Sequence, residues 1–131
     1  MEGHWSMSDE NATLGQLRRL MADFVAERQW QKYHDAKNLS MSIAIEAAEL
    51  MEHFQWTCCD ELPELLRVER LRERVGEEIA DIMCFVLALA NVLELDLSSA
   101  VERKIAKNAV KYPVETFRGR YFKPGEGPLG A

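Results

Sequence analysis

Four carboxylates occur in two pairs with the same spacing. Glu46 and Glu49 stand three residues apart in the stretch IAIEAAELMEHFQW, and Glu78 and Asp81 stand three apart where a strongly apolar run begins. In a helix, residues three apart project within about 60° of each other, so each pair shares one face. Apolar residues border both pairs, so the acids lie at the edge of a buried stripe rather than opposite it.

If the two helices pack antiparallel, these four carboxylates meet at the margin of the core. Four like charges in a partly dehydrated pocket repel one another, and a divalent cation would neutralise them. Ligation by carboxylate oxygens alone suits the hard cation Mg2+, or Mn2+ as a substitute, and not zinc. The spacing therefore predicts a Mg2+ site, although a single pair of this kind is usually a solvated helix face.

A basic stripe follows in the last helical segment. Three lysines and one amide recur there at i, i+3, i+4 and i+7: Lys104, Lys107, Asn108 and Lys111. If this stripe faces the acids, a metal-bound polyphosphate would fit between them, and Lys37 and Asn38 would add phosphate contacts. The alternative is a solvated lysine face.

Aromatic and histidine side chains gather near the ends of the predicted helices. Trp30, Tyr33 and His34 lie in the connector QWQKYHDAKN, and Trp56 closes the segment that carries the first acidic pair. Rings at the mouth of a site can stack on a nucleobase. The alternative for each ring is packing at a helix end.

The composition narrows the class of partner. The chain has 131 residues and a formal net charge of -6, which argues against general binding to nucleic acid, because that needs clustered positive charge. Three cysteines without metal-site spacing predict a reduced, cytoplasmic protein. We see no signal peptide, and the longest apolar run, 82–90, is too short to span a bilayer.

Apolar periodicity predicts an all-α, bundle-like fold, because no stretch alternates with the period of a strand. Four helices are expected, over residues 14–28, 39–56, from 64–69 to 93, and from 99 to the stop at Pro113. Expected N-terminal caps are Thr13 with Gln16, Asn38, and Ser99 with Glu102. One domain, 13–115, is expected between a flexible segment, 1–12, and an irregular tail, 116–131. The run 82–90 is apolar all round, which predicts a homo-oligomer, either a dimer or a tetramer.

Taken together, these segments resemble a known family. EAAE at 46–49 and EIAD at 78–81 resemble the E-x-x-E … E-x-x-D signature of the MazG-like nucleoside triphosphate pyrophosphohydrolases. ERQWQKYHDAKN, FQW and KIAKNAVKYPVE resemble the dCTP pyrophosphatase branch. The resemblance implies a MazG-type four-helix fold, a homo-oligomer, Mg2+, and attack of water on the α-phosphorus. The products would be a nucleoside monophosphate and pyrophosphate, and the substrate dCTP or a modified dCTP.

The resemblance also implies roles for individual residues. Metal binding and catalysis fall to Glu46, Glu49, Glu78 and Asp81. The base and sugar pocket would be shaped by Trp30, His34 and Trp56, and Lys104 and Asn108 would contact the phosphates, with Lys111 and Tyr112 in the same segment. Two positions depart from the branch, since Phe85 stands where a tyrosine is frequent and Met21 where a histidine is frequent. Both departures concern the choice of base rather than the metal.

One other hypothesis is disfavoured by the spacing, and two remain open. A di-iron bundle would need Glu-x-x-His on two helices, whereas His53 follows Glu49 by four residues. A non-catalytic helical module would bind a nucleotide or a protein without releasing pyrophosphate. A bundle with structural Mg2+ would be stabilised by the metal without any dependence on nucleotide.

Overall fold

The computed structural model describes residues 6–122 and 125–126, and within these residues it contains helices and no strand. The all-α prediction is therefore confirmed. The chain divides into two compact units after Leu95. The outer parts of the predicted flexible segment 1–12 and of the predicted tail 116–131 lie outside the described residues.

The first unit holds three longer helices joined by short helical turns. Its elements are α1 (Leu14–Glu27), η1 (Gln31–Tyr33), α2 (Ala36–Glu52), η2 (Cys59–Glu61), α3 (Leu62–Leu65) and α4 (Glu69–Val92). The second unit holds α5 (Leu97–Lys111) and α6 (Val114–Phe117). No helix in the described part of the chain has the length and apolar character needed to cross a membrane.

The predicted cap of α1 is confirmed. The Thr13 hydroxyl accepts a hydrogen bond from the Gln16 backbone N–H at 3.2 Å, and the Gln16 side-chain oxygen accepts one from the Thr13 backbone N–H at 2.7 Å. This capping box satisfies two backbone donors that the helix itself cannot.

The predicted caps of α2 and α5 are wrong by three residues. Asp35 caps α2, where its Oδ1 accepts a hydrogen bond from the backbone N–H of Asn38 at 2.8 Å. Asp96 caps α5 in the same way, accepting from the backbone N–H of Ser99 at 2.8 Å. In both helices an aspartate upstream supplies the capping oxygen, so the expected cap residue becomes part of the first turn.

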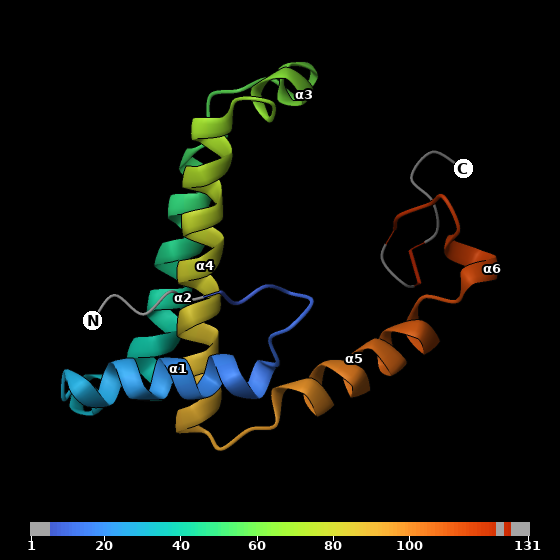
Figure 1. Ribbon diagram of the computed structural model, residues 1–131. Coiled ribbons are helices and arrows are strands. Elements are labelled where there is room, and N and C mark those ends of the chain that lie inside the picture. The colour runs from blue at the N-terminus through green and yellow to red at the C-terminus, as the bar shows by residue number, and fades with distance from the viewer. Residues whose placement is uncertain (1–5, 123–124, 127–131) are drawn as a thin grey trace. The chain divides into compact units, whose positions relative to one another are not determined.

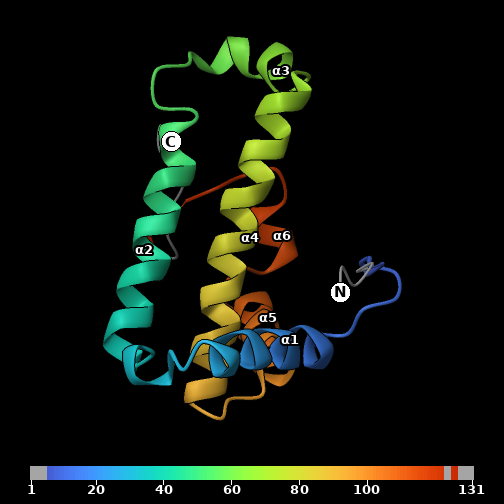
Figure 2. The same ribbon diagram turned by 60° about the vertical axis from the view of Figure 1, so that its left-hand side comes forward.

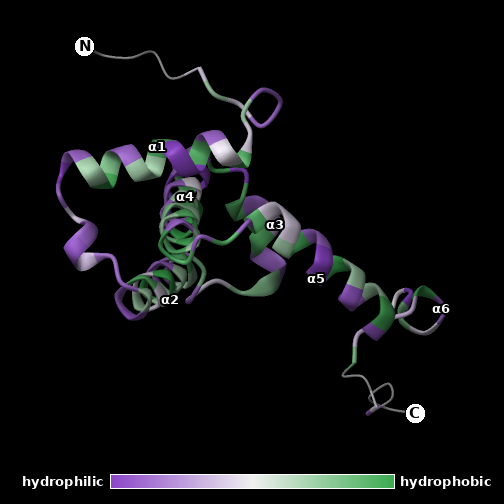
Figure 3. Ribbon diagram, turned by 90° about the horizontal axis from the view of Figure 1, so that it is seen from below, coloured by the Kyte–Doolittle hydropathy of each residue, from purple (hydrophilic) through white to green (hydrophobic). Residues whose placement is uncertain are grey.

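Helices α2 and α4 run antiparallel, side by side, and α1 crosses them near the C-terminal end of α4 (Figures 1 and 2). The buried apolar side chains come from all three helices: Val25, Leu39, Leu87, Ala88 and Ala90. Two of these five are alanines on α4, and a small side chain lets another helix approach closely. Figure 3, which looks towards the ends of α2 and α4, shows hydrophobic residues on both.

Arg18 of α1 is hydrogen-bonded to the C-terminal end of α4. Its guanidinium donates to Asn91 Oδ1 at 2.9 Å and to the carbonyls of Ala90 and Leu95 at 3.2 and 2.7 Å. Asn91 in turn donates to the Arg18 carbonyl at 2.9 Å. Carbonyls at the end of a helix lack partners within it, so Arg18 both caps α4 and fixes α1 against it.

Large apolar side chains are exposed on both units. They include Met41, Ile45 and Met51 on α2, and Val101, Ile105 and Val110 on α5. In the second unit, α5 ends before Pro113 as predicted, and the ring of Phe117 packs against Tyr112 and Phe122, with centroids 5.1 and 4.6 Å apart. The exposed apolar positions bear on the proposed assembly, because patches of this kind often mark interaction surfaces.

Candidate active site

Three of the four predicted metal ligands converge in the first unit. Glu46 and Glu49 of α2 and Glu78 of α4 each offer one carboxylate oxygen, and these oxygens lie within 4.8 Å of one another. The antiparallel packing of α2 against α4 brings the two pairs together (Figure 2). Glu46 and Glu78 are half-buried and Glu49 is exposed, so the cluster lies at the margin of the core.

The fourth predicted ligand, Asp81, lies outside this close set. It is exposed, one turn beyond Glu78 on α4. Its negative charge nevertheless acts on the cluster, because it contributes to raising the pKa of Glu46. The structure thus brings three of the acids together, and Asp81 lies outside this group but close enough for its charge to affect Glu46.

The negative charge of Glu46 is unfavourable at this position. Burial raises the pKa of its carboxyl above the ordinary value of 4.5, and the close approach of the Glu49 carboxyl and the charges of Glu49, Asp81 and Glu78 raise it further. Its Oε2 is buried and has no hydrogen-bond partner among the described residues. A buried oxygen without a donor is costly, and a bound cation would supply the missing positive charge. The donor set, all carboxylate oxygens, therefore fits a hard divalent cation.

His53 touches the cluster, a contact that the spacing did not predict. Its Nε2 lies 3.2 Å from Glu78 Oε1, and its side chain is only 8% exposed, against 20% for Glu78. From the sequence, His53 is considered only as a ligand of a di-iron site, for which its spacing from Glu49 is wrong. The signal for its contact was present but weak, because His53 follows Glu49 by one helical turn and so lies near the same face.

A cavity of about 390 Å³ lies between α1, α4 and the connector that leads to α2. Its walls are mostly apolar, with a few polar groups: Met21, Ala22, Asp23, Val25, Ala26, Gln31, His34, Ala88, Asn91 and Val92. Of the predicted base-pocket residues, His34 lines this cavity, and so does Met21, the position noted as a departure from the branch. A largely apolar cavity with a few polar side chains is typical of a site for a small molecule.

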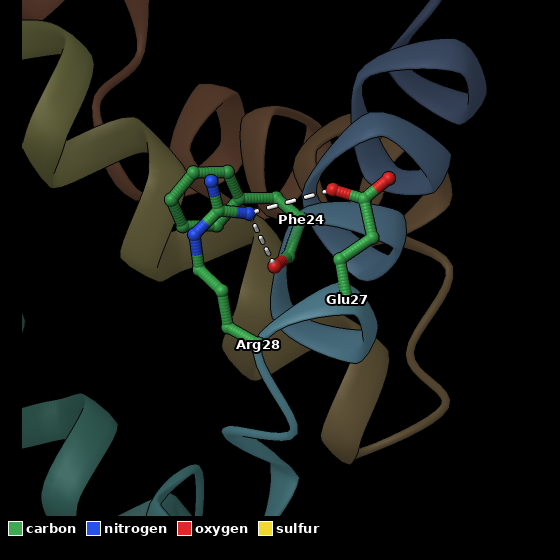
Figure 4. Close-up of polar contacts among 3 residues, drawn as sticks. All are labelled: Phe24, Glu27 and Arg28. Atoms are coloured by element: carbon green, nitrogen blue, oxygen red, sulfur yellow. Dashed lines mark hydrogen bonds and ion pairs between the residues drawn. The ribbon is translucent and has the colours of Figure 1, made fainter.

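Trp30 lies beside the end of α1, where its ring packs edge-on against Phe24 with centroids 5.8 Å apart. Figure 4 shows how Phe24 is held: the Arg28 guanidinium lies over its ring at 3.6 Å and donates to its carbonyl at 3.0 Å. Arg28 also contacts Glu27 at 3.5 Å. The ring of Trp30 is thus held on one side by Phe24, and 44% of its surface stays exposed.

The other predicted substrate residues belong to several elements of the two units. Trp56 lies beyond the end of α2 and is 88% exposed, and Phe85 is half-buried on α4. Lys37 is exposed in the first turn of α2, and Asn38 donates its side-chain amide to the Tyr33 carbonyl at 3.1 Å. The remaining three belong to α5 in the second unit, where Asn108 is half-buried and the two lysines are exposed: Lys104, Asn108 and Lys111.

Comparison with known proteins decides the family. The model of the MazG-like family matches residues 41–123. The chain belongs to the MazG-like family. In this MazG-like protein the matched range covers both acidic pairs and α5.

Two curated relatives and one solved structure are similar to this MazG-like chain over most of its length. The dCTP pyrophosphatase 1 of Bos taurus is 39% identical over 129 residues, which are 98% of this chain and 76% of that protein. The dCTP pyrophosphatase 1 of Homo sapiens is 37% identical over 129 residues, covering 98% and 75%. A crystal structure of a pyrophosphatase from Archaeoglobus fulgidus superposes with a TM-score of 0.72 at 44% identity, covering 82% of this chain and 98% of that one. These relatives confirm the predicted resemblance and agree with the predicted enzyme class.

Proposed function

We propose that this MazG-like protein is a nucleoside triphosphate pyrophosphohydrolase that converts dCTP, or a modified dCTP, to the monophosphate and pyrophosphate in a Mg2+-dependent reaction. The observation that carries the proposal is the convergence of Glu46, Glu49 and Glu78 from two helices, with a buried Glu46 oxygen that lacks a partner in the described chain. The substrate rests on the relatives, whose names specify dCTP.

Glu46, Glu49 and Glu78 would hold the cation, and Asp81 would complete the set. When bound, the metal supplies a positive charge for the phosphate oxygens and acidifies a water molecule. The carboxylates would hold the ion at the edge of the core, where Glu46 and Glu78 are half-buried. One of the four acids, or the adjacent exposed Glu77, accepts the proton of the attacking water as a general base.

The cavity beside α4 is suited to the nucleobase. Asp81 and Ala88 are about 10 Å apart along α4 at the rise of an α-helix, so a base in the cavity would leave its phosphates near the acids. Apolar walls would contact the ring faces, and His34 would lie beside the base or sugar. Trp30, Trp56 and Phe85 would add aromatic contacts at the rim.

Phosphate binding is assigned to basic and amide side chains. Lys37 at the start of α2 and the α5 residues Lys104, Asn108 and Lys111 would hold the triphosphate and the leaving pyrophosphate by charge-assisted hydrogen bonds. Asn38 would act less directly, because its amide already holds the Tyr33 carbonyl and so shapes the connector.

The protein would work as a homo-oligomer, either a dimer or a tetramer, with a small-molecule nucleotide as its other partner. The exposed apolar residues on α2 and α5 support assembly, because they would remain in contact with water in a monomer. The net charge of -6 opposes binding to nucleic acid, and the unpaired cysteines favour the cytoplasm.

A nucleotide panel tests the proposal. The full chain is incubated with Mg2+ and each canonical or modified deoxynucleoside triphosphate, and monophosphate and pyrophosphate are quantified by chromatography. We expect equimolar products, fastest with dCTP or a modified dCTP, and none after addition of EDTA. A protein that binds these nucleotides but releases no pyrophosphate from any would be a non-catalytic module, and the proposal would fail.

A further inference from the structure

We infer that His53 is a positioning residue that orients Glu78 toward the divalent cation. The inference rests on the proposed function, because it assumes that the acidic cluster holds a metal. Among the described residues, His53 is the only histidine, lysine or arginine within ion-pair distance of the cluster, at 3.2 Å from Glu78 Oε1.

The chemistry of a metal ligand assigns the direction of this hydrogen bond. A carboxylate that binds a cation has only acceptor atoms, so the His53 Nε2–H would donate the hydrogen bond and Glu78 Oε1 would accept it. The bond restrains the rotation of the Glu78 carboxylate before any metal arrives. No described residue donates to the second Glu78 oxygen, which is thus available to a cation.

The position of His53 at the end of α2 explains why its side chain can restrain the Glu78 carboxylate. Helix α2 ends at Glu52, and the His53 backbone N–H donates back to the Leu50 carbonyl at 3.3 Å, which fixes the residue to the end of the helix. The ring is therefore carried by α2, like Glu46 and Glu49, while its hydrogen bond reaches α4. One side chain sets the position of the α4 ligand relative to the two α2 ligands.

A merely structural role is the competing explanation, since the same bond also joins α2 to α4. The two roles differ in what the bond controls. If it only joins the helices, its loss lowers the melting temperature and leaves metal affinity unchanged. If it orients Glu78, its loss weakens metal binding, because partners that hold a ligating group commonly change metal affinity about 10- to 100-fold.

The test is Mn2+ binding to the full chain without nucleotide, measured by calorimetry and by electron paramagnetic resonance. His53→Leu removes the donor and keeps an apolar side chain, and His53→Gln restores an N–H donor. Gln55→Leu is the matched control, because Gln55 is exposed in the same turn and does not belong to the cluster. We expect the Mn2+ dissociation constant to rise at least about tenfold in His53→Leu and to return close to the wild-type value in His53→Gln. The control should bind as the wild type does.

A second readout separates the roles. The melting temperature in EDTA reports the helix contact alone, and the metal concentration for half-maximal turnover reports the site. In His53→Leu this metal concentration should rise while the nucleotide KM at saturating metal stays unchanged. Wild-type Mn2+ affinity in His53→Leu, whatever its melting temperature, overturns the inference and leaves the proposed function standing. Wild-type protein that binds no Mn2+ at all overturns both.

Discussion

Glu46 of α2 and Glu78 of α4 each bring a carboxylate oxygen to within 4.8 Å of the other, although they belong to different helices. Nothing in the described chain neutralises Glu46, and its raised pKa records the cost of placing it there. A protein that keeps half-buried acids close enough to repel one another loses stability at that point, and such losses of stability are typical of functional sites. A metal-dependent hydrolase accounts for this arrangement.

Glu49→Gln should reduce pyrophosphate release at least about a hundredfold at any Mg2+ concentration, because a neutral amide ligates Mg2+ poorly. Glu49 is exposed, so circular dichroism and the melting temperature should change little. The matched control is Glu52→Gln, an exposed acid on the same helix but outside the cluster, which should keep full activity. Full turnover by Glu49→Gln at saturating Mg2+ would exclude Glu49 as a ligand.

Asp81→Asn tests the ligand that stands apart from the close set. If Asp81 completes the coordination, this variant should lose turnover by a factor similar to that of Glu49→Gln and should require more metal. Kinetics over a range of Mg2+ concentrations measure both effects. A variant with wild-type turnover and wild-type metal dependence would restrict the site to Glu46, Glu49 and Glu78.

Glu46→Gln should stabilise the metal-free protein while abolishing activity. The pKa of Glu46 is raised above 4.5 in the folded state, so the folded chain holds a proton that the unfolded chain has lost. The free energy of unfolding of the metal-free wild type should therefore decrease as pH rises from about 4.5 through the raised pKa. In the variant, which has no carboxyl group at this position, this decrease should be absent. Thermal unfolding in EDTA across this range measures it. Identical pH profiles for wild type and variant would show that Glu46 is not strained.

Ala26→Leu should weaken nucleotide binding without touching the metal. Ala26 lies on α1 and lines the cavity, and it is exposed, so a larger side chain enters the cavity at little cost to folding. The nucleotide KM should rise about tenfold or more, with Mn2+ affinity unchanged. Ala44→Leu, at an exposed position of α2 away from the cavity, is the control. An unchanged KM in Ala26→Leu would mean that the base binds elsewhere.

Ile45→Glu should break the proposed assembly. Ile45 is more than half exposed on α2, among other exposed apolar side chains of that helix, and a charge there would be costly in an interface. Light scattering should give the wild type a mass of at least twice 15.0 kDa and give the variant a smaller one. Gln55→Glu adds the same charge at an exposed polar position and should leave the mass unchanged. Wild-type protein that is monomeric at micromolar concentration would refute the assembly.

The sequence predicts the helices better than their ends. Apolar spacing located the four long helices because one buried face fixes a period of 3.6 residues. The caps of α2 and α5 were misplaced because Asp35 and Asn38, or Asp96 and Ser99, are all good caps. Local sequence alone does not decide which of two such residues takes the extended backbone of a cap.

The site was predictable as far as it depends on one helix at a time. The E-x-x-E spacing placed Glu46 and Glu49 on one face of one helix, and the spacing of the second pair placed Glu78 and Asp81 on one face of another helix. The contact between His53 and Glu78 depends on the register between α2 and α4, which no spacing within a helix contains. The cavity at His34 likewise depends on how α1 crosses α4. Whether the α5 lysines reach the acids is still a prediction.

Anomalous scattering from crystals grown with Mn2+ tests the central claim most directly. Data collected at the manganese absorption edge should show a peak within ligand distance of Glu46, Glu49 and Glu78, and the peak should be missing in Glu49→Gln. Well-diffracting wild-type crystals with manganese bound only at other acids, or with no peak between α2 and α4, would contradict it.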